Sequence, residues 1–500
     1  MDQAILETGR GGRLAAPPRC AVVDLGSNSV RLVVYEGRGR NPIPIFNEKA
    51  VLRLGRGLQT TGRLNEAGVA QALKVMVRYH AIAHAMRADP FDVLATAAVR
   101  DASNGEAFVA ALRERMPGAA IRILSGPEEA TLSAAGLQCG VSDADGILAD
   151  IGGGSLELVQ LDAAGARHAA TLRLGVIRLS ERAEGNLDRA RDLADEDLAT
   201  LPWLSGGQDR SLYLVGGAWR ALARVHMQHV RYPLNIVHHY TIGQESGREL
   251  VHLVTTTGRL AGTPRRRAED LPYAAIVLRR LMRATGARRL VFSAYGIREG
   301  WFLQTVPEAI RRLDPLLAMA RDSAERLSRD PALPPALIVW TAPLFPYETP
   351  DHARLRHAAC WMSDTGSHDH PEYRAELTFE RTLYAPGALD HPTRAFLAIA
   401  MATRYEAEAD APFLATARFL LDPAATARAE VLGTALRLAY TLSAGTPDLL
   451  ARATLRLEPG RVVLRLDGPG VFAGDGVQRR LERLAALLGL GAVMEDSAEA

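Results

Sequence analysis

Hydrophobic and polar positions along the first 300 residues predict strands and helices in alternation. Short aliphatic and β-branched runs bounded by Gly, Asp or Ser predict strands. Apolar residues at three- and four-residue spacing between these runs predict amphipathic helices. The predicted strands are 20–25, 30–36, 91–95, 121–124, 172–174 and 212–215. The predicted helices are 65–87, 105–115, 127–137, 188–201 and a helix after Gly216-Gly217. Such alternation is typical of layered α/β domains.

The pattern changes after Trp301, where long segments rich in alanine and leucine carry few strand signals. We therefore expect an all-α domain, followed by a small α+β module with strands at 453–457 and 461–466 and a helix at 476–488. The predicted organisation is a disordered arm at 1–18, lobes at 19–140 and 141–304, a helical domain at 305–430 and the module at 431–500.

One sequence motif occurs twice in the chain. The segment VVDLGSNSVRLVVYE, ending at Glu36, aligns with LADIGGGSLELVQLD, ending at Asp162. The alignment superposes Asp24 on Asp150, Gly26 on Gly152 and Ser29 on Ser155. Each copy is a strand, a carboxylate, a turn of small residues and a second strand, so the repeat predicts two lobes that open on the same hairpin.

The residue types of these hairpins suit an anion. Small residues let successive backbone N–H groups face one concavity, and the hydroxyls of Ser27, Ser29 and Ser155 add donors. A carboxylate at Asp24 or Asp150 does not itself favour an anion, but it can hold Mg²⁺ or a water beside a phosphate. An ordinary Asp-Gly turn is the alternative for either copy alone, and the duplication makes it less favourable. The sequence contains no Gly-Lys-Ser/Thr Walker pattern.

Composition narrows the class of protein. The 500 residues are 48% hydrophobic with a net charge of +2, and almost all cations are arginine. The planar guanidinium group of arginine is well suited to binding phosphate, although a GC-rich coding sequence would also favour arginine over lysine. The cysteines Cys20, Cys139 and Cys360 are scattered without a C-x-x-C pair, which favours a reducing compartment over disulfides or zinc. No apolar run is long enough for a membrane span, so we expect a soluble cytoplasmic protein.

Six blocks resemble the exopolyphosphatase and guanosine-pentaphosphate phosphohydrolase (Ppx/GppA) family in order and spacing over residues 20–302. They are VVDLGSNSVRLVV, ATAAVRDASN, ILSGPEEATLSAAG, LADIGGGSLELV, LRLGVIRLSER and VFSAYGIREGWF. The resemblance implies two ribonuclease-H-like lobes of the actin-like, sugar-kinase-like kind, with phosphate chemistry in the cleft between them. Less specifically, the remaining residues are similar to the all-α HD-like domain and α+β module of longer exopolyphosphatase-like members.

The resemblance also implies roles for single residues. Glu129 of SGPEEA matches the catalytic base, and Glu157 matches a second acidic residue that assists with metal or water. Glu128 is expected to be the solvated partner, and a charged first helical turn is the alternative reading of the pair. The implied metal-binding residues are Asp24, Asp150 and Glu157. The implied phosphate-binding residues are Gly26, Ser27, Asn28, Ser29, Arg100, Gly152, Gly153, Gly154, Ser155, Gly216, Gly217 and Arg298.

The resemblance therefore implies a Mg²⁺-dependent exopolyphosphatase that processively removes terminal phosphate from inorganic polyphosphate, as a homodimer without nucleic-acid or membrane partners. Hydrolysis of pppGpp to ppGpp by the same site is the close alternative, since both substrates end in a phosphoanhydride. Phosphotransfer to a nucleoside diphosphate differs only in the acceptor. A non-catalytic regulator that binds guanosine alarmones is a third alternative, and a retained Glu129 argues against it.

Two further features stay open. The arginines from Arg265 to Arg289 form either a polyanion track or a solvated helix face. In the helical domain, His368-Asp369 resembles the dyad of metal-binding HD domains but falls in a predicted loop. The dyad position on the helix through Cys360 reads Ser363-Asp364 instead, which favours a degenerate domain without metal.

Overall fold

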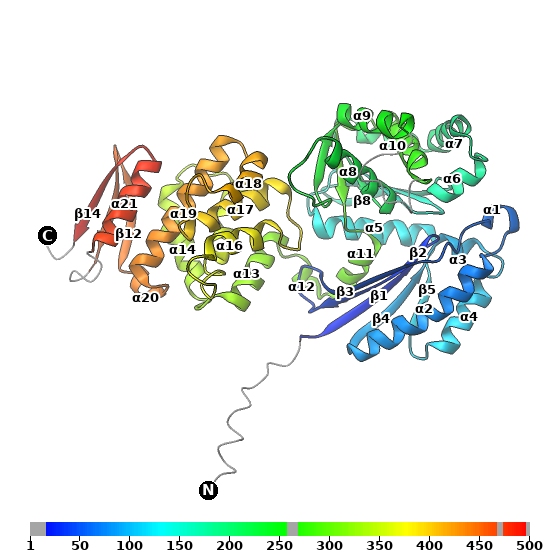
Figure 1. Ribbon diagram of the computed structural model, residues 1–500, viewed down its shortest axis with the longest axis horizontal. Helices are drawn as coiled ribbons and strands as arrows, with labels where there is room; N and C mark the ends of the chain where they lie inside the picture. Colours follow the sequence, from blue (N-terminus) through cyan, green and yellow to red (C-terminus); the bar gives the residue numbers. More distant parts are fainter. Residues whose placement is uncertain (1–16, 258–268, 468–473, 497–500) are drawn as a thin grey trace, which may run out of the picture. The chain divides into compact units, whose positions relative to one another are not determined.

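The computed structural model describes residues 17–257, 269–467 and 474–496. Most of the predicted N-terminal arm and Arg265, Arg266 and Arg267 lie outside the described residues. The chain divides into two compact units: Met1–Val230 with Thr241–Arg312, and Arg231–Tyr240 with Leu313–Ala500. Figure 1 traces the elements of both units.

The first lobe of the first unit is a five-stranded mixed sheet in the order β3-β2-β1-β4-β5. β1 pairs antiparallel with β2, which pairs antiparallel with β3, while β1 and β4 run parallel, as do β4 and β5. The strands are β1 (Arg19–Leu25), β2 (Ser29–Glu36), β3 (Ile43–Val51), β4 (Ala88–Ala95) and β5 (Ala120–Ile123). The helices are α1 (Leu58–Thr61), α2 (Glu66–Ala85), α3 (Ala97–Asp101) and α4 (Gly105–Arg115).

The predicted strands and helices of this lobe are present, but β3 and the short helices α1 and α3 were not predicted. β3 is an edge strand with few buried positions, and it contains Pro44, Asn47 and Glu48. Without a buried face it lacks the alternation that signals a strand. The α2 helix begins at Asn65, whose side chain accepts a hydrogen bond from the Gly68 amide, as expected for an N-cap.

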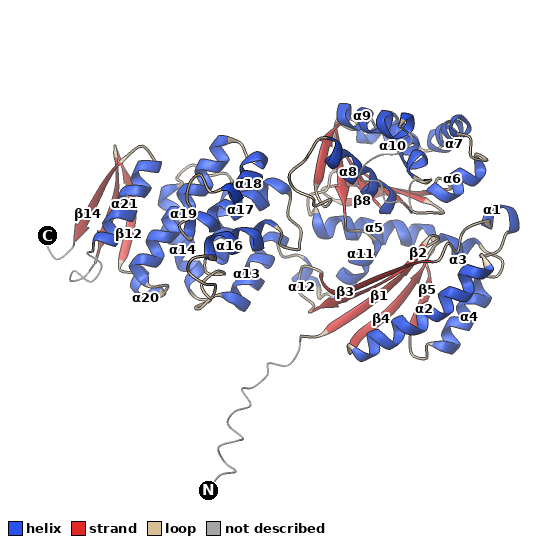
Figure 2. Cartoon of the chain, viewed as in Figure 1, coloured by secondary structure: helices blue, strands red, loops and turns tan. Residues whose placement is uncertain are grey.

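The second lobe repeats this topology around a six-stranded sheet in the order β10-β11-β9-β6-β7-β8. Figure 2 shows helices against both sheets of the unit. The strands are β6 (Gly146–Ile151), β7 (Leu156–Asp162), β8 (Gly165–Leu172), β9 (Ser211–Val215), β10 (Tyr240–Gly243) and β11 (Arg289–Ser293). The helices are α6 (Val176–Arg182), α7 (Leu187–Ala199), η1 (Pro202–Gly207), α8 (Gly217–His229), α9 (Gln244–Thr256) and α10 (Leu271–Thr285). The strand predicted at 172–174 is instead β8, which ends at Leu172.

Two helices tie the lobes together. α5 (Gly126–Gly140) packs against α11 (Ile297–Thr305) at glycine contacts: a Cβ on Gly136 would lie 1.8 Å from the Gly296 carbonyl oxygen. Although α11 follows the second sheet in sequence, its Trp301 and Phe302 are buried in the core of the first lobe with Tyr35. The short helix α12 (Glu308–Arg311) completes this unit.

The second unit is helical and ends in a three-stranded sheet ordered β12-β13-β14. Its helices are α13 (Pro315–Leu327), α14 (Leu333–Thr341), η3 (Ala342–Leu344), α15 (Pro350–Met362), α16 (Arg374–Leu383), α17 (His391–Arg404), η4 (Pro412–Leu414), α18 (Ala415–Leu420), α19 (Pro423–Ser443), α20 (Pro447–Leu450) and α21 (Asp475–Leu487). Its strands are β12 (Ala453–Glu458), β13 (Arg461–Leu466) and β14 (Gly491–Asp496). The boundary expected at 430 falls inside α19, and one hydrophobic core extends through helices and sheet.

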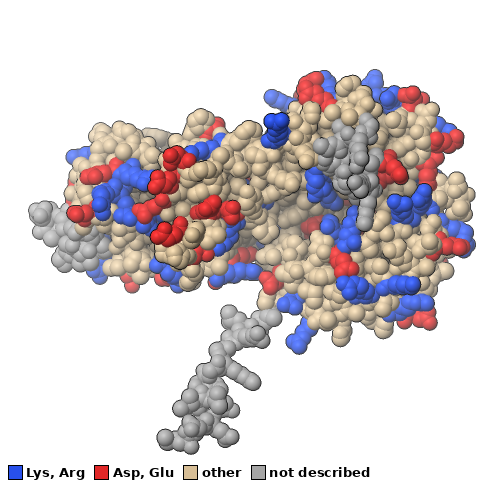
Figure 3. Space-filling view, in the orientation of Figure 1, with Lys and Arg blue, Asp and Glu red and all other residues tan. Residues whose placement is uncertain are grey.

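Charge of both signs is distributed over the surface, as Figure 3 shows for one face. Among the described residues, no helix is both long enough and apolar enough to span a bilayer.

Candidate active site

The two repeated hairpins have the same backbone geometry. The Gly26 amide donates to the Ser29 carbonyl at 3.1 Å, and the Gly152 amide donates to the Ser155 carbonyl at 3.0 Å. The strand registers also match, because Asp24 lies opposite Arg31 and Asp150 opposite Glu157. The internal repeat in the sequence is therefore a repeat of structure.

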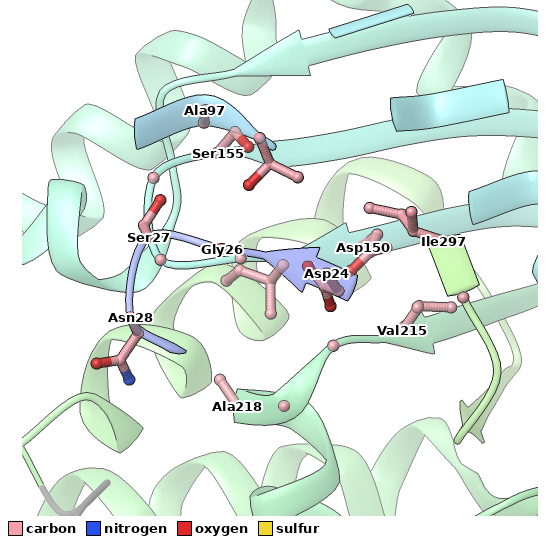
Figure 4. A pocket seen from close by; sticks show the side chains of 18 of the residues that line it. Asp24, Gly26, Ser27, Asn28, Ala97, Asp150, Ser155, Val215, Ala218 and Ile297 are labelled. Atoms are coloured by element: carbon pink, nitrogen blue, oxygen red, sulfur yellow. The ribbon is translucent and has the colours of Figure 1, made fainter. Parts of the chain in front are cut away.

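The hairpins face one another across a polar cavity of about 160 Å³ between the two sheets. Figure 4 shows Asp24 and Asp150 side by side at their strand ends, with Ser27 and Ser155 on the loops. The cavity brings together all but one of the residues predicted from the sequence: Asp24, Gly26, Ser27, Asn28, Ser29, Glu129, Asp150, Gly152, Gly153, Gly154, Ser155, Glu157, Gly216, Gly217 and Arg298. Arg100, the exception, lies behind Glu129 and forms an ion pair with it.

The two glycine-bearing loops approach each other closely. A Cβ on Gly153 would lie 3.1 Å from the Ser27 Cβ, and one on Gly154 would lie 3.0 Å from the Ser27 Oγ. Within the described residues, the amides of Ser27, Asn28, Gly153 and Gly154 have no protein acceptor. Small residues are needed here for close approach, and the amides they expose are donors for an anion.

Four carboxylates gather in this cavity, and burial raises the pKa of each. For Asp24 and Asp150, loss of hydration is the largest cause; Glu299 further raises the pKa of Asp24, and Asp24 further raises that of Asp150. Ser133 Oγ donates to Asp150 Oδ2 at 2.6 Å. Burial and the nearby Glu129 carboxylate raise the pKa of Glu157 well above its usual value, and its Oε1 has no partner among the described residues.

Glu129 is placed and polarised by its surroundings. It lies in the first turn of α5 and is only 3% exposed. Burial raises its pKa to about 7, with further upward contributions from Asp150 and Asp24, although Arg100 opposes the shift. Arg100 is itself held by the Leu124 carbonyl at 2.9 Å and by Asp101 at 3.2 Å. The carboxylate is therefore fixed in direction and can exchange a proton near neutral pH.

The adjacent Glu128 has a different environment. Its carboxylate accepts hydrogen bonds from the Ser125 amide at 2.8 Å and hydroxyl at 2.7 Å, which forms a capping box at the start of α5. Its side chain is 51% exposed, and the bonds to Ser125 hold its pKa below the usual range. The structure thus separates the pair as expected, with Glu129 inward and Glu128 in solvent.

Three arginines and Lys49 line the cavity and supply its positive charge. Arg298 approaches Asp24 at 3.9 Å; burial opposes its charge, but Glu299, Tyr35 and Asp24 raise its pKa overall. Arg220 donates to the Ala294 carbonyl at 3.1 Å. Burial lowers the pKa of Arg220 to about 10, and the charges of Arg298 and Arg31 add to this shift. Cations that repel one another in a confined space favour binding of an anion.

Arg31, Lys49 and Arg220 line the cavity but were missed by sequence reasoning. A signal existed for Arg31, because hairpin pairing sets it opposite Asp24. Arg220 follows the double glycine at the start of α8, which is a weaker signal. Lys49 lies on the unpredicted β3 and reaches the site by pairing opposite Arg31.

The acidic residues fit a divalent cation that shares its ligands with substrate. Among the described residues, no group of three or more His, Cys, Asp or Glu side chains could hold a metal ion alone. Mg²⁺ is usually bound by one or two carboxylates together with phosphate oxygens and water. The neighbouring Asp24 and Asp150 carboxylates and the unpartnered Glu157 Oε1 offer such a set.

Comparison with known proteins places this architecture in a family. Residues 33–309 match the model of the Ppx/GppA phosphatase family, and residues 316–494 match the model described as exopolyphosphatase, C-terminal. Exopolyphosphatase 2 of Mycobacterium tuberculosis is 32% identical over 174 residues, 33% of this chain and 54% of the relative. The match thus spans about half the length of that relative.

A second relative is matched over more of its length. Exopolyphosphatase 1 of Mycobacterium bovis is 27% identical over 303 residues, 57% of this chain and 88% of the relative. The crystal structure of an exopolyphosphatase from Cytophaga hutchinsonii covers 58% of this chain and 99% of its own, with a TM-score of 0.53 and 22% identity. This likeness confirms the predicted actin-like α/β fold, while the HD-like character of the helical domain stays a prediction. The chain belongs to the Ppx/GppA phosphatase family.

Proposed function

We propose that this protein is an exopolyphosphatase: it hydrolyses the terminal phosphoanhydride of inorganic polyphosphate in the cavity between the two lobes. The observation that carries the proposal is Glu129, a buried carboxylate with a pKa of about 7 that faces two loops of unpartnered backbone amides. A site that only binds an anion has no use for such a group, because a carboxylate repels the ligand.

The terminal phosphoryl group is held by fixed donors. In this proposal the amides of Ser27, Asn28, Gly153 and Gly154 donate to its oxygens, and Arg298 and Arg220 balance its charge. The backbone amides form part of the folded loops, so they need no reorganisation as charge spreads over the phosphoryl group in the transition state.

Glu129 accepts the proton of the attacking water. The water oxygen forms a bond to the terminal phosphorus while the bridging P–O bond breaks, which gives orthophosphate and a chain shortened by one unit. Arg100 acts as a positioning residue, because it holds the Glu129 carboxylate and limits how far its pKa rises.

We assign Mg²⁺ to Asp24, Asp150 and Glu157. When bound, the ion would neutralise phosphate charge and lower the repulsion between substrate and carboxylates. Processive action, a homodimeric state and a cytoplasmic location complete the proposal. The three cysteines are free and buried, which is compatible with a reducing compartment.

The test offers purified full chain three substrates with Mg²⁺: long polyphosphate, tripolyphosphate and pppGpp, with released orthophosphate as the readout. The proposal predicts rapid release from polyphosphate and its loss when Mg²⁺ is chelated. The Glu129→Gln protein controls for contaminating phosphatase. Release from pppGpp alone would replace the assignment by guanosine pentaphosphatase, and binding of all three without release would replace it by a regulatory role.

A further inference from the structure

The second unit contains a separate cavity of about 360 Å³, and half of its lining residues are arginines. It lies among α16, α17, α19 and α21, next to the loop that contains Ser367, His368 and Asp369. Its lining residues are Arg329, Ser367, Arg374, Arg404, Tyr405, Arg437, Tyr440, Thr441, Ala444 and Arg480. In Figure 3, basic side chains gather over the region of α19 and α21, with acidic side chains beside them.

The centre of this arginine pocket is Arg404, which is 3% exposed. Its guanidinium carbon lies 3.7 Å from the ring centroid of Tyr440 and 4.5 Å from that of Tyr405. Among the described residues, its Nε and Nη1 have no hydrogen-bond partner. A buried guanidinium that stacks on two rings but leaves its donors unused costs stability unless another group accepts from it.

Other buried arginines of the same unit have hydrogen-bond acceptors for their guanidinium groups. Arg356 donates to Glu348, to the Ile338 carbonyl and to Thr341. Arg394 donates to four backbone carbonyls between Leu383 and Leu389. The unpartnered donors of Arg404 are therefore not a general property of buried arginines in this unit.

Three other arginines that line the pocket also have a buried donor without a hydrogen-bond partner in the described part of the chain. The Nε atoms of Arg374, Arg437 and Arg480 are buried and also have no partner among the described residues. Glu406 accepts from both Arg437 and Arg480 at 2.7 Å, and Asp364 accepts from Arg329 at 2.8 Å. Five guanidinium groups thus share two paired carboxylates, which leaves a surplus of positive charge in a half-enclosed space.

Ser363 and Asp364, which occupy the dyad position of the HD domains, lie beside the arginine pocket and have partners there. Asp364 is buried and engaged by Arg329, and the Ser363 hydroxyl lies 3.0 Å from the Tyr440 hydroxyl. Asp369 accepts from Arg381, and the described residues of this unit contain no group of three or more His, Cys, Asp or Glu side chains that could hold a metal ion. The groups presented at this place are cations, which suit an anion.

We propose that the arginine pocket is a second ligand site, which binds a compact phosphate anion carrying two or more phosphoryl groups. Guanidinium forks match phosphoryl oxygens in pairs, and several phosphoryl groups are needed to meet arginines from five segments of the chain. The pocket is too small for a long polymer and lies within one unit. Inorganic oligophosphate and the phosphates of a nucleotide share this chemistry.

The test is calorimetric titration of the full chain with inorganic tripolyphosphate, in the Glu129→Gln background so that the probe is not consumed. We expect two classes of binding site. Adding Arg374→Gln with Arg480→Gln, both half-buried at the rim, weakens one class by roughly 10-fold or more. The matched control is Arg418→Gln, which removes an arginine paired with Glu430 outside the pocket and leaves both classes unchanged. Thermal unfolding verifies that each variant is folded.

Hydrogen exchange locates the lost class: tripolyphosphate protects α17 and α19, and the double variant abolishes this protection. Competition with GTP distinguishes the two possible ligands. If GTP displaces tripolyphosphate from the arginine pocket, the pocket accepts the phosphates of a nucleotide. If GTP does not displace it, the ligand is inorganic oligophosphate. A single class of site, two classes unaffected by the double variant, or equal binding of citrate would overturn the proposal. Phosphate release by the double variant with Glu129 intact is measured separately, so failure of the proposed function is distinguishable.

Discussion

Glu129 is the residue on which the proposed reaction depends, and its pKa results from opposing effects. Burial and the carboxylates of Asp150 and Asp24 raise it, while Arg100 lowers it, to a value of about 7. Its proton is therefore bound more tightly in the folded than in the unfolded state. The stability that this gives is complete below about pH 4.5, the usual value for a glutamate, and is lost as the pH rises through 7. The fold thus sacrifices stability at neutral pH for a group that titrates there.

Glu129→Gln tests this role directly. The amide keeps the shape of the side chain but cannot accept the proton of the water, so we expect kcat to fall by about 100-fold or more while polyphosphate binding persists. The measurement is initial-rate orthophosphate release together with equilibrium binding. Glu128→Gln is the matched control on the next residue, and it should keep near-normal rates because glutamine also completes a capping box. Equal losses in the two variants would remove Glu129 from the mechanism.

Arg100→Gln is expected to shift the pH dependence rather than to abolish activity. Removal of the cation leaves burial and the neighbouring carboxylates unopposed, so the pKa of Glu129 rises further. Because the base must be deprotonated, the acidic limb of kcat/KM should move upward by about one pH unit. Arg122→Gln, which removes an arginine 3.9 Å from Glu128, should leave the limb in place. An unshifted limb in Arg100→Gln would show that another group sets the pH profile.

Among the structural elements, the two glycine-bearing loops form one binding surface because they contact each other. The second loop is held from behind by α6, whose amides at Val176 and Ile177 donate to the carbonyls of Gly152 and Gly153. With their carbonyls engaged behind them, the loop amides can face the cavity. The distance between loop and loop therefore depends on the absence of a side chain at Gly153 and Gly154.

Gly154→Ala is the smallest change that tests this contact. The added methyl would lie 3.0 Å from the Ser27 Oγ and 3.2 Å from the Ala97 Cβ, so these neighbours must shift by a few tenths of an ångström. We expect phosphate release to fall by roughly 100-fold, since small displacements at a positioned site are costly, while thermal unfolding changes little. Gly243→Ala serves as control, because its Cβ meets nothing within 4 Å. Normal rates in Gly154→Ala would mean that close loop contact is not required.

At the scale of the whole molecule, the two units are not divided where the sequence pattern changes. The first unit continues to Arg312, and the segment Arg231–Tyr240 from its middle belongs to the second unit. Leu234 of that segment is buried in the core of the second unit. The chain therefore leaves the first unit twice, after Val230 and after Arg312.

A fragment that ends at Arg312 should be folded, whereas one that ends at Leu303 should be much less stable. The shorter fragment loses the end of α11, the buried Val306 and the packed Ile310, which cover Trp301 and Phe302. Loss of such core contacts costs several kcal/mol. Circular dichroism melts of both fragments give the comparison, and tripolyphosphate hydrolysis should survive only in the longer one. Equal melting temperatures would show that the terminal residues of the first unit are dispensable.

Features that depend on local spacing could be read from the amino-acid sequence alone. A carboxylate, a turn of small residues and a second strand specify a hairpin register within a few residues, so the repeat of Asp24 in Asp150 could be read directly. The motif blocks also indicated the family, which the comparison confirms for residues 33–309. Glu129 was separable from Glu128 only through the resemblance, because either carboxylate is compatible with a first helical turn.

Which residues far apart in the sequence come together is visible only in the folded protein. Lys49 reaches the cavity through a strand that has no sequence signal, Arg100 acts from behind Glu129, and α11 crosses to the first lobe. The arginine pocket joins residues from 329 to 480, none of which belongs to a motif. Local patterns fix backbone conformation over one or two turns. Convergence of side chains far apart in sequence depends instead on how whole elements bury their apolar faces, which periodicity alone does not specify.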